Sequence, residues 1–236
     1  MHHEPYQHAT DYRGLVATAV IAAAAWGLSS VGYYEIMDRL GLRIGYNDAP
    51  VVFAFYYAAW TGLVAALFYR GLRAWYRRFN PPRYKAAPLV PVALVAGFAL
   101  VVLPRLPVTE WTLPETPPDL LSATPFYFLP KTVEILFQQV LITALILSLR
   151  ARSASLIRIS LVTAALFGGF HLSMVLTIDE AGHVAVYTIA AMLFGAIAPW
   201  LYMRARDGFA WAYGLHLGFY ALDTVIVHLV MAAPAA

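Results

Sequence analysis

TVEILFQQVLITALILSL, residues 132–149, is an almost continuous run of apolar side chains that contains one carboxylate, Glu134. About 20 mainly apolar residues are enough for a helix to cross the hydrocarbon core of a membrane. Six further segments of similar length and composition are 14–33, 51–69, 86–104, 159–178, 184–203 and 208–231. The sequence therefore predicts an all-α polytopic bundle of about seven transmembrane helices, with about eight as the alternative.

The composition also indicates a membrane protein. Of the 236 residues, 61% are hydrophobic and 12% are charged, against about 25% charged in soluble domains. The chain has no cysteine, which excludes disulfide bonds, thiolate metal sites and a cysteine nucleophile. The net charge of +3 does not require nucleic acid, because basic residues beside membrane spans set topology. We therefore expect membrane lipid, and no nucleic acid, among the partners.

The distribution of basic residues predicts an orientation. Twelve of the 16 Lys and Arg residues fall in 1–13, 70–85, 150–158 and 204–207, which lie on one side of a seven-span bundle. The other four are Arg39, Arg43, Arg105 and Lys131. The positive-inside rule then places the N-terminus in the cytoplasm. We expect an integral membrane protein, of the bacterial inner membrane, whose first span is retained rather than cleaved.

Several ionisable side chains fall within the predicted spans of the C-terminal half. They are Glu134, His171, His216, Asp223 and His228. Such groups cost roughly 2.5–3.5 kcal/mol each on insertion scales, so they usually mark a function or a polar pair. His216 and Asp223, with Tyr220 between them, recur at i, i+4 and i+7 and share one helix face. The alternative is structural, with each histidine bonding a carbonyl and the Glu reaching the headgroups.

The sequence lacks the motifs of several catalytic mechanisms. It contains no HExxH zinc motif and no GxSxG nucleophile elbow. A paired-aspartate protease needs two intramembrane aspartates, and Asp223 is the only one. What remains is a Glu with His. A carboxylate among apolar walls can act as general base for water, while one histidine holds that water and another stabilises the oxyanion.

Three short motifs in 127–231 resemble the CPBP family, the group of CAAX proteases and bacteriocin-processing enzymes also called the Abi family of glutamic intramembrane proteases. The family pattern is EExxxR, FxxxH and HxxxN. Phe167 and His171 match FxxxH, and His216 falls on the histidine of the last motif. The division expected is an N-terminal three-span region with an extracytoplasmic loop, 1–126. The core, 127–236, would hold the catalytic residues on the four C-terminal helices.

VEILFQQVLIT resembles the first motif but departs from it. When Phe137 is aligned with the family's aromatic residue, Val133 takes the place of the water-activating Glu. In that register Glu134 is the second Glu, and Gln138 replaces the Arg. A shift of one residue makes Glu134 the base and places Gln139 at the Arg position. Both registers remain open.

The resemblance implies an intramembrane endopeptidase without a cofactor. Glu134 and His171 would activate water, while His216 would stabilise the oxyanion. Tyr220 stands where the family has Asn, and its hydroxyl can also donate to an oxyanion. The residues expected to orient the base or bind substrate are Gln138, Gln139, Phe167 and Asp223. We expect a membrane-associated, exported or lipid-anchored peptide as substrate, and no metal ion, although two His and one Glu suit zinc in principle.

Two other classes of function compete with proteolysis. One is a catalytically degenerate scaffold or immunity protein that binds a peptide without cleaving it, which Val133 and Tyr220 favour. In that case the adjacent side-chain amides of Gln138 and Gln139 would make hydrogen bonds between helices. The other is a haem-binding electron carrier, but bis-histidine ligation needs two histidines at matched depth. His171 and His216 differ in predicted depth by about 8 Å.

Overall fold

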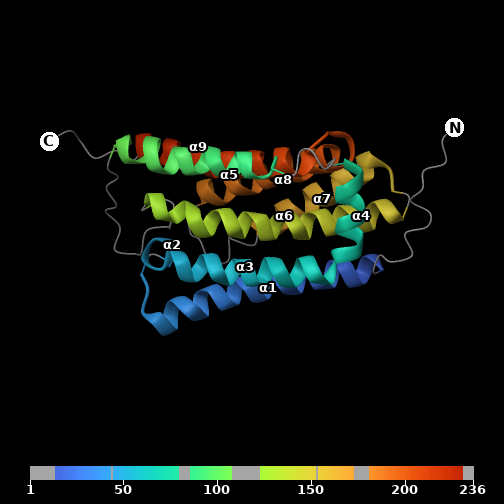
Figure 1. The fold of residues 1–236 in the computed structure, drawn as a ribbon, viewed down its shortest axis with the longest axis horizontal. Helices are drawn as coiled ribbons and strands as arrows, with labels where there is room; N and C mark the ends of the chain where they lie inside the picture. Colours follow the sequence, from blue (N-terminus) through green and yellow to red (C-terminus); the bar gives the residue numbers. More distant parts are fainter. Residues whose placement is uncertain are drawn as a thin grey trace. The chain divides into compact units, whose positions relative to one another are not determined.

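The structure, a computed structural model, describes residues 14–43, 45–79, 86–107, 123–152, 154–172 and 181–230. Every regular element in these ranges is helical (Figure 1), which confirms the all-α class. The α-helices are α1 (Leu15–Leu40), α2 (Gly45–Asp48), α3 (Pro50–Leu67), α4 (Tyr69–Phe79), α5 (Leu89–Gly97), α6 (Phe128–Ala151), α7 (Leu156–Leu172), α8 (Ala181–Arg204) and α9 (Gly208–Val230). Short π- and 3-10 segments continue α5 and lead into α6: η3 (Phe98–Val102), η4 (Leu103–Arg105) and η5 (Pro125–Tyr127).

Five helical segments are long and apolar enough to cross a membrane, which indicates an integral membrane protein. They are Leu15–Leu40, Pro50–Leu67, Pro125–Ala151, Val184–Arg204 and Gly208–Val230. Two other predicted spans form shorter apolar helices, Leu89–Arg105 and Leu156–Leu172. The 17 residues of α7 extend about 25 Å, short of the roughly 30 Å hydrocarbon core. The predicted count of seven spans therefore remains a prediction, and 173–178 of the fifth lie outside the described residues.

The helices belong to two compact units. The first unit comprises Met1–Ala22, Phe68–Lys85 and Leu141–Ala212. The second unit comprises Ala23–Leu67, Ala86–Val140 and Tyr213–Ala236. Each unit draws residues from both sides of the predicted boundary at 126/127, and the division into 1–126 and 127–236 remains a prediction.

The first unit is built on the close packing of α7 against α8. Gly195 permits this approach, because a Cβ there would lie 2.7 Å from the carbonyl oxygen of Thr163. The Thr163 hydroxyl in turn donates to the Gly195 carbonyl at 2.6 Å. At the end of α8 the chain turns sharply through Asp207, whose φ is 55°. A Cβ at the next residue, Gly208, would overlap the Leu201 carbonyl oxygen, so the turn requires glycine.

The second unit has an aromatic core around α2 and the first half of α6. The Tyr46 ring contacts those of Phe53 at 5.5 Å, Tyr57 at 6.0 Å and Tyr127 at 5.8 Å between centroids. The Phe137 ring lies 6.2 Å from that of Tyr57. Aromatic side chains of this size supply most of the buried apolar area of a small core. Two of these rings, Tyr46 and Tyr127, also lie within 6 Å of Lys131 Nζ on α6, at 5.2 Å and 5.7 Å from their centroids.

Candidate functional site

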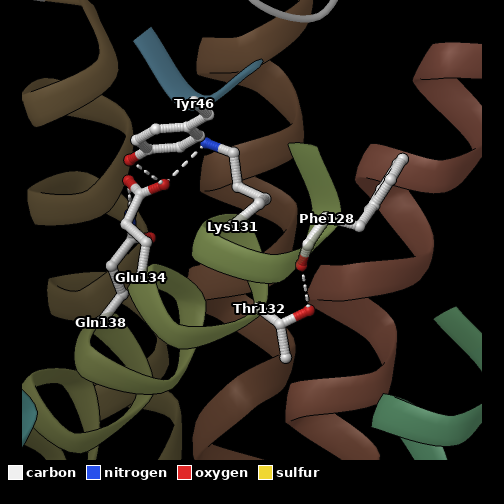
Figure 2. A network of polar contacts seen from close by, with 6 residues as sticks. All are labelled: Tyr46, Phe128, Lys131, Thr132, Glu134 and Gln138. Carbon is white, nitrogen blue, oxygen red and sulfur yellow. Dashed lines mark hydrogen bonds and ion pairs between the residues drawn. The ribbon is translucent and has the colours of Figure 1, made fainter. Parts of the chain in front are cut away.

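Glu134, in the second turn of α6, is the centre of a network of polar contacts (Figure 2). Its Oε2 accepts a hydrogen bond from the Tyr46 hydroxyl at 2.9 Å and pairs with Lys131 Nζ at 2.7 Å. Its Oε1 accepts a hydrogen bond from Gln138 Nε2 at 2.9 Å. The Lys131 and Glu134 side chains are only 11% and 15% exposed. Three donors therefore compensate a carboxylate that little water reaches.

The local sequence explains why these side chains meet. Lys131, Glu134 and Gln138 recur at i, i+3 and i+7 in α6, and this spacing places them on one helix face. Tyr46 is supplied by α2, the short helix between α1 and α3. The chain enters this connection through Gly41 and reaches α2 at Gly45, with φ angles of 61° and 39°. A left-handed backbone of this kind favours glycine.

The Tyr46 side chain is 4% exposed. Burial raises the pKa of its hydroxyl well above the ordinary value, and the negative charge of Glu134 raises it further. Both effects disfavour the tyrosinate. Tyr46 is therefore a neutral donor to Glu134 at all physiological pH values.

Sequence reasoning missed two residues of this cluster, Tyr46 and Lys131. The predicted span 132–149 leaves Lys131 just outside it, but α6 begins at Phe128 and includes Lys131. Its Nζ lies 4.3 Å from the ring centroid of Tyr220, 5.2 Å from that of Tyr46 and 5.7 Å from that of Tyr127. Cation–π contacts of this kind strengthen when they are desolvated. The i, i+3 spacing of a Lys and a Glu was the signal that could have revealed the pair.

A second buried polar contact joins α6 to α9. Gln139 Nε2 lies 2.9 Å from His216 Nδ1, and the two side chains are 0% and 6% exposed. An amide NH₂ can only donate, so Nδ1 accepts and the neutral imidazole carries its proton on Nε2. The two amides thus differ in partner, with Gln138 on Glu134 and Gln139 on His216. The His216 ring also stacks on that of Tyr220, with centroids 5.8 Å apart.

Three more ionisable side chains follow His216 on α9, namely Tyr220, Asp223 and His228. Tyr220 is buried, and Asp223, one turn further along, is half-buried. His228 is 9% exposed, and its Nδ1 lies 2.8 Å from the carbonyl oxygen of Pro107. Because a carbonyl only accepts, Nδ1 carries the proton of a neutral His228.

His171 and Phe167 belong to the first unit, whereas Glu134 and His216 belong to the second. His171 occupies the last turn of α7 and is half-buried. Its Nδ1 lies 2.8 Å from the Phe167 carbonyl oxygen, and the two rings are 5.1 Å apart. With Nδ1–H donating, Nε2 is the nitrogen that can accept a proton. The pairing of His171 with Glu134 remains a prediction.

The described residues give no metal-binding constellation. No group of three or more His, Cys, Asp or Glu side chains gathers in the part of the chain that the structure describes. His183, at the mouth of a predicted span, has a side chain outside that part.

No family model, curated protein or solved structure matches this chain. The resemblance to the CPBP family therefore rests on the three sequence motifs alone.

Proposed function

We propose that this chain is a glutamic-type intramembrane endopeptidase in which Glu134 activates water. The supporting observation is that the polar cluster of α6 retains unfilled acceptor positions. Glu134 Oε1 accepts one hydrogen bond and has a lone pair for a second. Gln138 Oε1 is buried with no partner among the described residues. A buried acceptor without a donor costs about 1–3 kcal/mol, so the cluster favours ligands that donate: water to Glu134, and a peptide N–H to Gln138.

The proposed reaction uses these groups in sequence. Glu134 takes a proton from water, and the resulting hydroxide oxygen bonds to the carbonyl carbon of the scissile peptide. The carbonyl oxygen becomes an oxyanion, to which the His216 Nε2–H donates. The C–N bond then breaks as Glu134 returns its proton to the leaving nitrogen, which yields a carboxylic acid and an amine. His171 would hold the same water, and Tyr220 would assist at the oxyanion.

The substrate class follows from the predicted topology. Glu134 is near the end of α6 that the positive-inside rule places outside the cytoplasm. We therefore assign a membrane-associated, exported or lipid-anchored peptide rather than a cytosolic tail. The proposed location is the bacterial inner membrane, with the N-terminus in the cytoplasm.

A second candidate function is peptide binding without cleavage, as in a scaffold or immunity protein. Lys131 Nζ lies 2.7 Å from Glu134 Oε2, and a buried ion pair of this kind can have a purely structural role. Val133 at the family's base position and Tyr220 at its Asn position favour the same function. In this case the unfilled acceptors would hold a peptide backbone without activating water.

The test compares peptide termini in membranes of cells that produce the full chain or a variant. Glu134→Gln and His171→Ala should each abolish the new termini that the wild-type chain generates. The matched control is Glu35→Gln, since Glu35 is exposed and pairs with Arg39 one turn further along the same helix. Expression is measured for every variant by immunoblot.

The two candidate functions give opposite results. If Glu134→Gln produces the same termini as the wild-type chain, the proposed base is wrong. If the wild-type chain generates no new termini but binds a peptide that raises its melting temperature, the non-catalytic function is favoured. A purified wild-type chain with a haem absorption spectrum would instead support the electron carrier.

A further inference from the structure

Helix α4 (Tyr69–Phe79) differs in composition from the other long helices of the described residues. Of its 11 residues, four are arginine and none is acidic. The arginines are Arg70, Arg73, Arg77 and Arg78, and all four side chains are exposed. Eleven residues extend only about 16 Å, so α4 is too short to cross a bilayer.

The arginines and the apolar residues of α4 occupy opposite faces. Arg70, Arg73 and Arg77 recur at i, i+3 and i+7, the spacing of a single helix face. Trp75 lies on the other side and is 4% exposed. This separation is typical of a helix that lies on a membrane surface with its basic face toward the headgroups.

Trp75 fixes α4 to the corner between α8 and α9. Its Nε1–H donates to the Tyr202 carbonyl oxygen at 3.0 Å. Its ring centroid lies 5.6 Å from that of Tyr202 and 6.2 Å from that of Phe209. The arginine face is therefore held in one orientation rather than turning freely. Two more exposed arginines, Arg204 and Arg206, follow at the same corner.

The direction of α4 agrees with a surface location. Figure 1 shows α4 lying crosswise to α8, with which it shares the first unit. Since α8 contains a candidate membrane span, a helix crosswise to it runs along the membrane surface. Tyr69 is 54% exposed at the start of α4, and the Arg73 guanidinium lies 5.5 Å from its ring centroid. Aromatic residues are enriched at this headgroup level.

We propose that α4 is a binding site for anionic phospholipid headgroups, such as phosphatidylglycerol. The guanidinium fork matches two oxygens of a phosphodiester, and four such groups stand on one short helix without a carboxylate. Each basic residue near an anionic membrane surface strengthens binding about fivefold. The site is independent of Glu134 and of proteolysis, and it would fix the depth and tilt of the first unit in an anionic leaflet.

The test uses the purified full chain in detergent, with equimolar phosphatidylglycerol and phosphatidylcholine, and counts bound lipids by native mass spectrometry. The wild-type chain should retain phosphatidylglycerol in preference. The triple variant Arg70→Gln, Arg73→Gln, Arg77→Gln should lower that preference about tenfold or more. Replacing the same three residues with Lys, which keeps the charge, should preserve most of it.

A matched control removes equal charge elsewhere. Arg39→Gln, Arg43→Gln, Arg105→Gln in one chain should leave the lipid preference unchanged, since none of these residues is in α4. Thermal melting establishes that each variant is folded. If the triple α4 variant does not fold, the single change Arg73→Gln replaces it, with an expected fivefold loss.

Three results would overturn the proposal. They are a wild-type chain without preference, an equal loss in the α4 and control variants, and a lipid preference that inorganic phosphate alone abolishes. The last result would assign α4 to a free anion instead of a lipid.

Discussion

Lys131 Nζ lies 2.7 Å from Glu134 Oε2, and the two side chains are 11% and 15% exposed. Arg39 and Glu35 are also 2.7 Å apart, but their side chains are 74% and 55% exposed. The two pairs have the same separation and differ in burial. They therefore provide a direct comparison of a desolvated and a solvated ion pair within one chain.

Lys131→Met should destabilise the protein by about 3 kcal/mol, because it leaves the Glu134 charge buried without its cation. Arg39→Met should change stability by at most about 1 kcal/mol, since water screens the exposed pair. Thermal melting of the purified chain in detergent measures both. Lys131→Met with Glu134→Gln should regain most of the loss, because no uncompensated charge remains. Equal effects of the two single changes would contradict the burial of the Lys131 pair.

Tyr46→Phe should destabilise the protein by about 1.5–3 kcal/mol, the contribution of a hydrogen bond to a charged group. The ring, which contacts Phe53, Tyr57 and Tyr127, is retained, so packing should be unaffected. Melting in detergent is the measurement. Tyr34→Phe is the control, because Tyr34 is 65% exposed. A Tyr46→Phe chain as stable as the Tyr34→Phe chain would mean that the hydroxyl does not support Glu134.

Gln139 and His216 should be energetically coupled across α6 and α9. A double-mutant cycle of Gln139→Ala and His216→Ala is expected to give a coupling energy of about 1 kcal/mol, typical of a buried hydrogen bond between helices. Gln138→Ala with His216→Ala is the matched cycle, since Gln138 bonds Glu134 instead. Its coupling energy should be close to zero. A larger coupling for Gln138 than for Gln139 would reverse the assignment of the two amides.

Gly195→Ala should weaken the packing of α7 on α8. The added Cβ would lie 2.7 Å from the Thr163 carbonyl oxygen and 2.8 Å from Ala164 Cα. Backbone atoms on both sides must then separate, at a cost of about 1–3 kcal/mol. Gly169→Ala, on α7, meets nothing within 4 Å and should be neutral or slightly stabilising. If the melting curves of the two variants coincide, the close contact of Gly195 on α8 with α7 is contradicted.

The helical architecture follows from features that are local in the sequence. Runs such as 132–149 lack charge except at Glu134, and in a membrane such runs form helices because only a helix satisfies its own backbone groups. The same locality explains the error at Lys131, since the apolar pattern begins at residue 132 and the helix begins at Phe128. Helix ends depend on packing and on backbone geometry, which hydropathy does not report.

The residues that surround the candidate base, Glu134, could not be predicted from local features of the sequence. Tyr46 is 88 residues away from Glu134 along the chain, and nothing in its own neighbourhood distinguishes it from the other tyrosines. It becomes a partner because two glycines turn the chain between α1 and α3 and bring α2 onto α6. The partner of Gln139 likewise lies 77 residues away, on α9.

Composition and periodicity alone thus establish an all-helical membrane chain, a polar face on α6 and the positions of its ionisable side chains. The partners that hold those side chains are a property of the folded chain. Hydrogen bonds and ion pairs form between atoms about 3 Å apart. Residues far apart in sequence reach that distance only when the aromatic core around Tyr46 and the helices α6 and α9 have packed.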